Sequence, residues 1–210
     1  MAKYTIIKLK NLTPLHIGTG RENYDFSADD LQSDTISAAL AAMLAREGRG
    51  SDIEEFMNSF TVSSAFPFFK NHYFLPKIQG RINVNVEGAN EDEKRKELKN
   101  IKYIESTLWQ KLVAQNEKVV INQSQLQGKY LLSDSKDFYL PTKSQVIQRV
   151  TIPRCDGFDA QPFYFDWTYF REGGGIYFLV NAKKEVVDKI IELTCLLGEF
   201  GIGTDRNIGG

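Results

Sequence analysis

Hydrophobic residues recur along this chain with two different periods, and each period predicts one type of element. Dense or alternating apolar runs predict β-strands at 3–9, 144–153, 163–170 and 176–180. Apolar residues three or four positions apart predict amphipathic helices at 31–44 and 184–199. The second helix has its predicted buried face at Val187, Ile190, Ile191, Thr194 and Leu197. The first strand is so rich in apolar residues that we expect most of its surface to be buried.

The first predicted helix has polar residues at its start and glycines after its end. Ser33 or Asp34 can accept hydrogen bonds from the first free N–H groups, so we expect one of them to be the N-cap. Gly48 and Gly50 are expected to end this helix. Its predicted buried residues are Ile36, Ala39, Leu40, Met43 and Leu44. A shorter helix is expected at 52–58.

The middle of the chain has no sustained period. Aromatic residues cluster around Pro67 and Pro76. Because proline donates no ladder hydrogen bond, we expect edge or irregular segments whose rings mostly fill a core. Mixed charges at 87–100 predict an exposed loop or helix, 101–114 predicts a short helix, and 119–140 is rich in turns. These segments together indicate a long insertion.

The order strand, helix, insertion, strand, strand, helix predicts a fold of the α+β class. We expect one ferredoxin-like (RRM-like) βαββαβ domain over 1–210, with the insertion at about 60–143. Glycines at 173–175 predict a hairpin between the last two strands. The pattern lacks the final strand, so we expect the chain to be truncated before that strand and before a second similar domain.

Composition limits the class of protein. The hydrophobic fraction of 42% and the charged fraction of 25% are typical of globular proteins. No apolar run approaches the roughly 20 residues that span a bilayer, so we expect a cytoplasmic protein. Cys155 and Cys195 are isolated, which favours buried free thiols over a disulfide or a zinc site. The net charge of −1 means that any binding of nucleic acid must use a local patch.

Two glycine-rich loops are the strongest candidate sites. The loop at 198–210 contains five glycines and Arg206, and the loop at 11–21 contains His16, Gly18 and Gly20. Backbone without Cβ atoms can turn its N–H groups toward an anion, and arginine offers a planar fork to a phosphate. A helix C-cap at Gly198 or Gly201 followed by a flexible end is the structural alternative. Neither loop fits a P-loop or a Rossmann fingerprint, so no nucleotide cofactor is expected.

Three segments together resemble the RAMP superfamily of CRISPR proteins, and most closely the fourth Csm subunit of type III-A effector complexes. The first joins 15–20 (LHIGTG) with 33–40 (SDTISAAL), and the second joins 64–68 (SAFPF) with 74–77 (FLPK). The third, 201–209 (GIGTDRNIG), is similar to the glycine-rich loop of the superfamily. The resemblance covers the whole chain, which stops short of the last strand and the second domain of such subunits.

The resemblance implies a non-catalytic subunit that caps the 5′ tag of the crRNA. It also implies two protein partners, the large polymerase-like signature subunit and the backbone RAMP subunit. The residues assigned to the RNA by this likeness are His16, Gly18, Gly20 and Arg21 in the first loop, Arg149 and Arg154 beside a thumb-like segment, and Gly201, Gly203, Thr204, Arg206 and Asn207 in the last loop. Lys77, which follows Pro76, is a further candidate phosphate contact, although a solvated lysine is the common alternative.

Two other functions remain open. Related RAMP proteins cut crRNA precursors with a histidine as general acid or base, and His16 is the candidate for that role here. The other histidine, His72, has no evident partner in the sequence, and no Ser/His/Asp set or cluster of carboxylates is apparent. A scaffold that contacts only protein is the third possibility.

Overall fold

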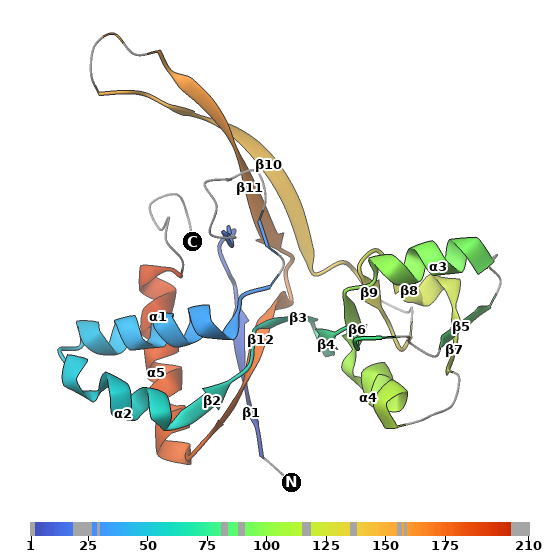
Figure 1. Cartoon of the computed structure of the whole chain (residues 1–210), viewed down its shortest axis with the longest axis horizontal. Coiled ribbons are helices and arrows are strands. Elements are labelled where there is room, and N and C mark those ends of the chain that lie inside the picture. The colour runs from blue at the N-terminus through green and yellow to red at the C-terminus, as the bar shows by residue number, and fades with distance from the viewer. Residues whose placement is uncertain are drawn as a thin grey trace. The chain divides into compact units, whose positions relative to one another are not determined.

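The structure is a computed structural model. It describes residues 3–18, 27–28, 30–80, 84–87, 91–114, 119–134, 138–154, 157 and 159–202, without the side chains of 91–95. The chain divides into two compact units (Figure 1). Unit 1 comprises Met1–Ala65 and Thr142–Gly210, and unit 2 comprises Phe66–Pro141.

The sheet of unit 1 is built around its last strand. β12 (Gly174–Ala182) lies between β1 (Thr5–Lys10) and β2 (Phe60–Val62) and is antiparallel to both. β12 is buried over most of its length, whereas β1 has Ile7 as its one buried residue and leaves Ile6 49% exposed. The prediction that the first strand is mostly buried was therefore wrong, because β1 is the outermost described strand of the sheet.

Two long helices supply the rest of the core of unit 1. α1 (Ser33–Arg46) is followed by the short η1 (Gly50–Asp52) and α2 (Ile53–Asn58), and α5 (Lys184–Phe200) follows β12. The buried residues of the long helices are Ile36, Leu40, Met43 and Leu44 in α1 and Val187, Ile190, Leu193 and Leu197 in α5. They pack in one cluster with residues of β1 and β12. The predicted face of α1 is confirmed, except that Ala39 is only half-buried.

Three details of these helices differ from the predictions: the buried face of α5, the N-cap of α1 and the exposure of Cys195. In α5, Leu193 is buried and Ile191 is 42% exposed, so the buried face is rotated from the predicted one. The N-cap of α1 is Gln32, and the N–H of Ser33 donates to Ser64 Oγ at 3.2 Å, so a neighbouring segment provides the acceptor. Cys195 is free and exposed rather than buried, and Cys155 lies outside the described residues.

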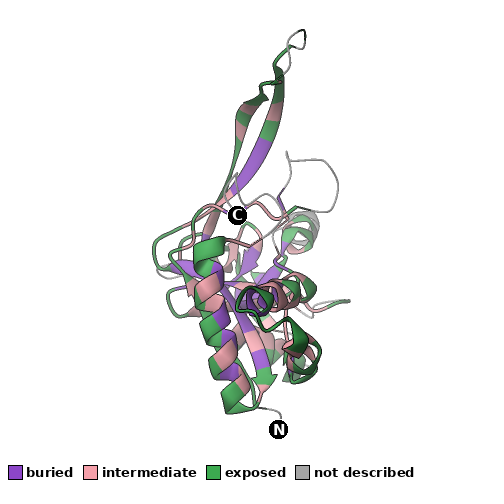
Figure 2. Cartoon of the chain, turned by 90° about the vertical axis from the view of Figure 1, so that its left-hand side faces the viewer, coloured by how far each residue is buried: buried purple, intermediate pink, exposed green. Residues whose placement is uncertain are grey.

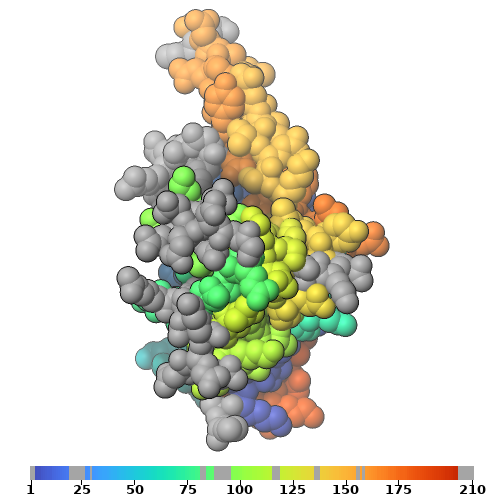
Figure 3. Space-filling model, turned by 90° about the vertical axis from the view of Figure 1, so that its right-hand side faces the viewer, coloured from blue at the N-terminus to red at the C-terminus, as the bar shows by residue number. Residues whose placement is uncertain are grey.

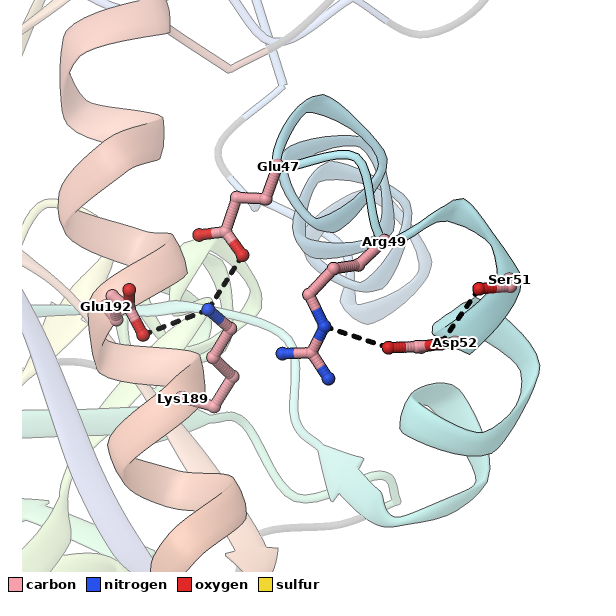
Figure 4. Close-up of polar contacts among 6 residues, drawn as sticks. All are labelled: Glu47, Arg49, Ser51, Asp52, Lys189 and Glu192. Atoms are coloured by element: carbon pink, nitrogen blue, oxygen red, sulfur yellow. Dashed lines mark hydrogen bonds and ion pairs between the residues drawn. The ribbon is translucent and has the colours of Figure 1, made fainter.

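Polar residues join the end of α1 to α5 (Figure 4). Lys189 Nζ lies 2.7 Å from Glu47 Oε2 and 3.0 Å from Glu192 Oε2. The hydrogen bond to Glu47 is the main cause that raises the pKa of Lys189 above its ordinary value. Nearby, Arg49 Nε donates to Asp52 Oδ2 at 2.8 Å, and this bond is the main cause that lowers the pKa of Asp52.

A long antiparallel hairpin projects from unit 1. β10 (Thr142–Thr151) pairs with β11 (Gln161–Phe170) over the full length of both strands. The predicted strands are thus confirmed, but the predicted hairpin at 173–175 was wrong, because β11 pairs with β10 and β12 pairs elsewhere. The tight turn does form, with the N–H of Gly174 donating to Arg171 O at 2.8 Å. Figure 2 shows buried residues at the base of the hairpin and exposed ones toward its tip.

Unit 2 contains strands and helices. Five of its strands follow one another in the order β3 (Phe66–Phe69), β4 (His72–Pro76), β6 (Tyr103–Glu105), β9 (Tyr130–Leu131) and β8 (Leu126–Gln127). β5 (Val84–Glu87) pairs in parallel with β7 (Val119–Asn122), and the helices are α3 (Glu91–Asn100), α4 (Ser106–Ala114) and η2 (Gln123–Gln125). The proline argument failed for β4, which is an inner strand, because Pro76 stands at its last position.

The aromatic residues of unit 2 fill a core, as the sequence predicted. Phe74, Tyr103 and Tyr130 are buried together with Leu132, and a second cluster forms around Ile104 and Leu131. The α+β class is confirmed by both units. The ferredoxin-like topology and the insertion boundaries at about 60–143 stay predictions. Among the described residues, no helix is long and apolar enough to cross a membrane.

Candidate nucleic-acid interface

The start of the first loop is bound to the hairpin. Leu15 and Thr168 of β11 exchange two backbone hydrogen bonds, of 3.0 and 2.8 Å. The next residue, His16, places its Nδ1 2.9 Å from the backbone oxygen of Asp166. A carbonyl oxygen can only accept, so Nδ1 carries the hydrogen in this contact. The orientation of the His16 ring is therefore set by β11.

The side chain of Asp166 binds Ser27, which follows the first loop and the undescribed segment 19–26 in the chain. This carboxylate is 8% exposed. Its Oδ2 accepts from the N–H of Ser27 at 3.1 Å, and its Oδ1 accepts a short hydrogen bond from Ser144 Oγ of β10. Ser27 Oγ in turn accepts from the N–H of Ile17 at 3.0 Å. Ile17 and Ser27, which lie on either side of the undescribed segment 19–26 in the chain, are thus in contact, and Ser27 also contacts β11.

An arginine lies against aromatic rings on the other face of β11. Phe165 is fully buried, and its ring centroid lies 4.4 Å from that of His16 and 4.8 Å from that of Trp167. The guanidinium carbon of Arg149 lies 5.3 Å from the centroid of Phe165 and 5.4 Å from that of Trp167. These distances are within the range of cation–π contacts. Two predicted RNA-binding residues, His16 and Arg149, therefore meet at one ring.

This arrangement suits a flexible polyanion with flat bases. Guanidinium groups donate to phosphates in a fixed fork and also stack on bases. Lys143 near the start of β10 and Arg154 after its end are both exposed, so positive charge extends along the strand. Figure 3 shows the hairpin as a narrow arm whose side chains reach the surface on this side. The hairpin thus offers the local basic patch that a chain of net charge −1 requires.

The other predicted residues of the loops divide into two groups. Those outside the described residues are Gly20, Arg21, Gly203, Thr204, Arg206 and Asn207, so their assignment to the RNA stays a prediction. Gly18 follows the bound start of the first loop, and a Cβ there would lie 3.9 Å from His16 Nε2. Gly201 is the C-cap of α5 with φ +78°, and its N–H donates to Leu197 O, so the end of the helix accounts for this glycine.

Lys77 and His72 lie in unit 2 and have partners there. Lys77 Nζ donates to Leu98 O at 2.6 Å, so the amine is held by the end of α3 rather than pointing outward. His72 Nδ1 lies 3.0 Å from Glu105 Oε1, so the prediction that His72 has no partner was wrong. Glu105 is 6% exposed, and its Oε2 accepts from both the N–H and the Oγ of Ser133 at 2.7 Å. Among the described residues, no group of His, Cys, Asp or Glu could hold a metal ion.

The sequence reasoning missed Asp166 and the rings beside it as parts of the interface. A signal for Asp166 was present, since it is the one charged residue within the aromatic run 163–170. An acid in such a run must be satisfied by hydrogen bonds once the run is buried. Glu105 carries the same signal after Tyr103 and Ile104. The partners of both acids are distant in sequence and could not be read from spacing.

Comparison with known proteins adds a sequence relative and solved structures. No protein-family model matches the chain. The CRISPR system Cms protein Csm4 of Thermococcus onnurineus (strain NA1) is 25% identical over 187 residues, which cover 82% of this chain and 57% of that protein. A chain of the crystal structure of a Csm1–Csm4 cassette in complex with cA4 matches with a TM-score of 0.64 and 20% identity, covering 93% of this chain and 66% of that one.

A second solved structure agrees in fold. A chain of the Csm3–Csm4 subcomplex of the type III-A CRISPR-Cas interference complex matches with a TM-score of 0.55 and 15% identity, over 90% of this chain and 65% of that chain. This chain therefore spans less than two thirds of the length of each of these proteins. The resemblance to Csm4 proteins deduced from the motifs is confirmed, in sequence by the Thermococcus relative and in fold by the two solved structures.

Proposed function

We propose that this chain is a cytoplasmic, non-catalytic crRNA-binding subunit of a type III-A Csm complex. In this role it caps the 5′ tag of the crRNA and joins the large signature subunit to the backbone filament. The observation that carries the proposal is the meeting of His16 and Arg149 at the ring of Phe165. A loop rich in backbone amides is thereby bound beside a fixed cation, which is the combination that recognises single-stranded RNA.

The two proposed protein partners are inferred from the similar solved structures. The solved relatives are named as a Csm1–Csm4 cassette and as a Csm3–Csm4 subcomplex. By analogy, we assign to this chain one large subunit like Csm1 and one backbone subunit like Csm3. Copurification of the tagged chain with each candidate subunit, expressed separately, tests each assignment.

RNA recognition is tested by titration of a fluorescent RNA that carries the repeat-derived tag, against the same RNA without it. We expect tighter binding of the tagged RNA and a fall in affinity with salt. Arg149→Ala should weaken binding by about tenfold, the effect of losing one well-placed contact. Arg206→Ala should also weaken it. Lys184→Ala is the control, because it removes the same charge from an exposed position at the start of α5.

Equal affinity for both RNAs without dependence on salt would contradict the proposal and favour a scaffold that contacts only protein. Deletion of 201–210 gives an independent test of the last loop. We expect the deletion to abolish selective binding of the tag and to lower stability modestly, because it removes Gly201, the C-cap of α5. Unchanged affinity after this deletion would contradict the assignment of the last loop to the RNA.

The rival function is metal-free cleavage of precursor RNA with His16 as general acid or base. Nδ1 of His16 contacts a backbone oxygen, which fixes the ring as a binding role requires. Incubation of the purified protein with repeat RNA in a chelator separates the two functions. We expect intact RNA. Cleavage that His16→Ala abolishes would overturn the non-catalytic proposal.

A further inference from the structure

Asp166 is a buried acid that the proposed RNA contacts do not use. It is 8% exposed, and no salt bridge to it is found among the described residues. A buried charge is costly unless polar partners satisfy it. The partners found here are the N–H of Ser27 and the hydroxyl of Ser144. The acid is thus retained where an apolar side chain would avoid the cost of desolvation.

Besides its bond with Ser144, Asp166 contacts residues on both sides of the undescribed segment 19–26. Its backbone oxygen accepts from His16 on the early side of the loop, and its carboxylate accepts from Ser27 on the late side. The two sides are also joined directly, since Ser27 Oγ accepts from the N–H of Ile17 and the N–H of Ala28 donates to Ile17 O at 2.8 Å. One residue of β11 therefore binds both His16 and Ser27.

The geometry of β11 places the hydrogen bonds of the Asp166 side chain on one face of the strand and the rings of Phe165 and Trp167 on the other. Successive side chains of a strand point to opposite faces, so Asp166 points away from its neighbours Phe165 and Trp167. Those two rings carry Arg149, and Phe165 also contacts His16. Three consecutive residues of β11 hence contact Ser27 on one face and the side chains of His16 and Arg149 on the other.

We propose that Asp166 is a positioning residue for RNA recognition, which holds His16 and Ser27 in place against the hairpin. This inference rests on the proposed RNA-binding function and deepens it. A loop fixed before binding loses less conformational freedom when the RNA arrives, which favours affinity. The acid acts through its hydrogen bonds, since its charge by itself repels phosphates.

The charge makes the test decisive, because geometry and electrostatics predict opposite signs. Removing an acid near the RNA should tighten binding by Coulomb's law alone. We expect Asp166→Ala to weaken binding of the tagged RNA by about tenfold instead. Asp166→Asn should retain affinity within about threefold, because its amide oxygen can accept from Ser27 while its NH₂ donates to Ser144. Asp188→Ala, at an exposed position of α5, is the control for charge and should not weaken binding.

Hydrogen exchange of the free protein separates this inference from the proposed function. In Asp166→Ala we expect faster exchange of the Ile17 and Ala28 amides, with the amides of α5 unchanged. If the wild type does not prefer tagged RNA, the proposed function fails whatever the exchange shows. If the wild type prefers tagged RNA but Asp166→Ala binds as tightly, or if exchange at Ile17 and Ala28 is unaffected, the positioning role is wrong. Should the alanine variant not fold, Ser144→Ala tests the same carboxylate, because it removes one hydrogen bond to Asp166. We expect a smaller loss of affinity for this variant. An unchanged affinity would contradict the positioning role.

Discussion

Two clusters in this protein are built from the same kinds of side chain. The hairpin cluster of unit 1 consists of His16, Ser27, Ser144, Phe165 and Asp166. The Glu105 cluster of unit 2 consists of His72, Glu105, Ser133 and Phe138. Each has a nearly buried acid, a histidine beside a phenylalanine ring, and serine donors. They differ in what the acid binds.

In the Glu105 cluster the acid binds the histidine. Its two oxygens accept three hydrogen bonds, from His72 Nδ1 and from the N–H and hydroxyl of Ser133. These bonds join β4, β6 and the segment after β9, so they stabilise unit 2 internally. In the hairpin cluster the histidine binds a backbone oxygen instead, and the acid binds the first loop. The comparison indicates a structural acid in unit 2 and a positioning acid in unit 1.

The largest expected effect is the loss of the structural acid. Glu105→Ala leaves three partly buried donors without their acceptor, and we expect the free energy of unfolding of unit 2 to fall by about 3 kcal/mol. Urea unfolding measures this loss. The chain has two tryptophans, and in a Trp167→Phe background the fluorescence of Trp109 reports on unit 2.

Glu105→Gln is the matched control for this experiment. Its amide retains one acceptor oxygen, so we expect a smaller loss, of about 1 kcal/mol. A loss below about 1 kcal/mol for the alanine variant would show that Glu105 is dispensable for the stability of unit 2. The contrast with Asp166 would then disappear.

The two histidines provide the next test, since the comparison predicts opposite phenotypes. His16→Ala should weaken binding of the tagged RNA by roughly fivefold to tenfold, because the variant loses the contacts of the ring with Asp166 O and Phe165. His72→Ala should leave RNA affinity unchanged and lower the free energy of unfolding by about 1–2 kcal/mol. Anisotropy titration and urea unfolding of both variants measure the two quantities. Weakened RNA binding by His72→Ala would mean that unit 2 also contributes to recognition.

The sequence predicted the elements of unit 1 better than their partners. The period of α5 was clear, but both Ile191 and Leu193 fit an apolar face, and only packing against the sheet decides between them. Glycines at 173–175 correctly indicated a turn, and an Asp-Gly pair at 156–157 indicated another turn between β10 and β11, but these two signals could not decide with which neighbour β11 pairs. Local patterns report local conformation, whereas strand pairing depends on contacts distant in sequence.

The candidate site shows the same limit. His16 and Arg149 were predicted separately from a family resemblance, and their common contact with Phe165 required the fold. Most of the predicted RNA-binding residues of the two glycine-rich loops lie outside the described residues. Asp166 and Glu105 were detectable only as acids within apolar or aromatic runs, and their roles depend on partners up to 150 residues away.

The smallest expected effect on stability concerns the ion pairs of Lys189, which are more exposed than the Glu105 cluster and the hairpin cluster. Lys189 binds Glu47 and Glu192 between α1 and α5 (Figure 4), and the hydrogen bond to Glu47 raises its pKa in the folded state. A raised pKa contributes stability below the pKa of the unfolded chain, and this contribution is lost as pH rises through the folded value.

Lys189→Met should therefore lower the free energy of unfolding by about 0.5 kcal/mol near neutral pH, and the difference from wild type should shrink above a pH of about 10.4. Urea unfolding at several pH values measures it, with Lys184→Met, an exposed lysine of the same helix, as the control. A loss as large as that of Glu105→Ala would contradict the comparison, because it would mean that burial of the acid is not what makes the Glu105 cluster strong. A difference that grows with pH would contradict the sign of the pKa shift.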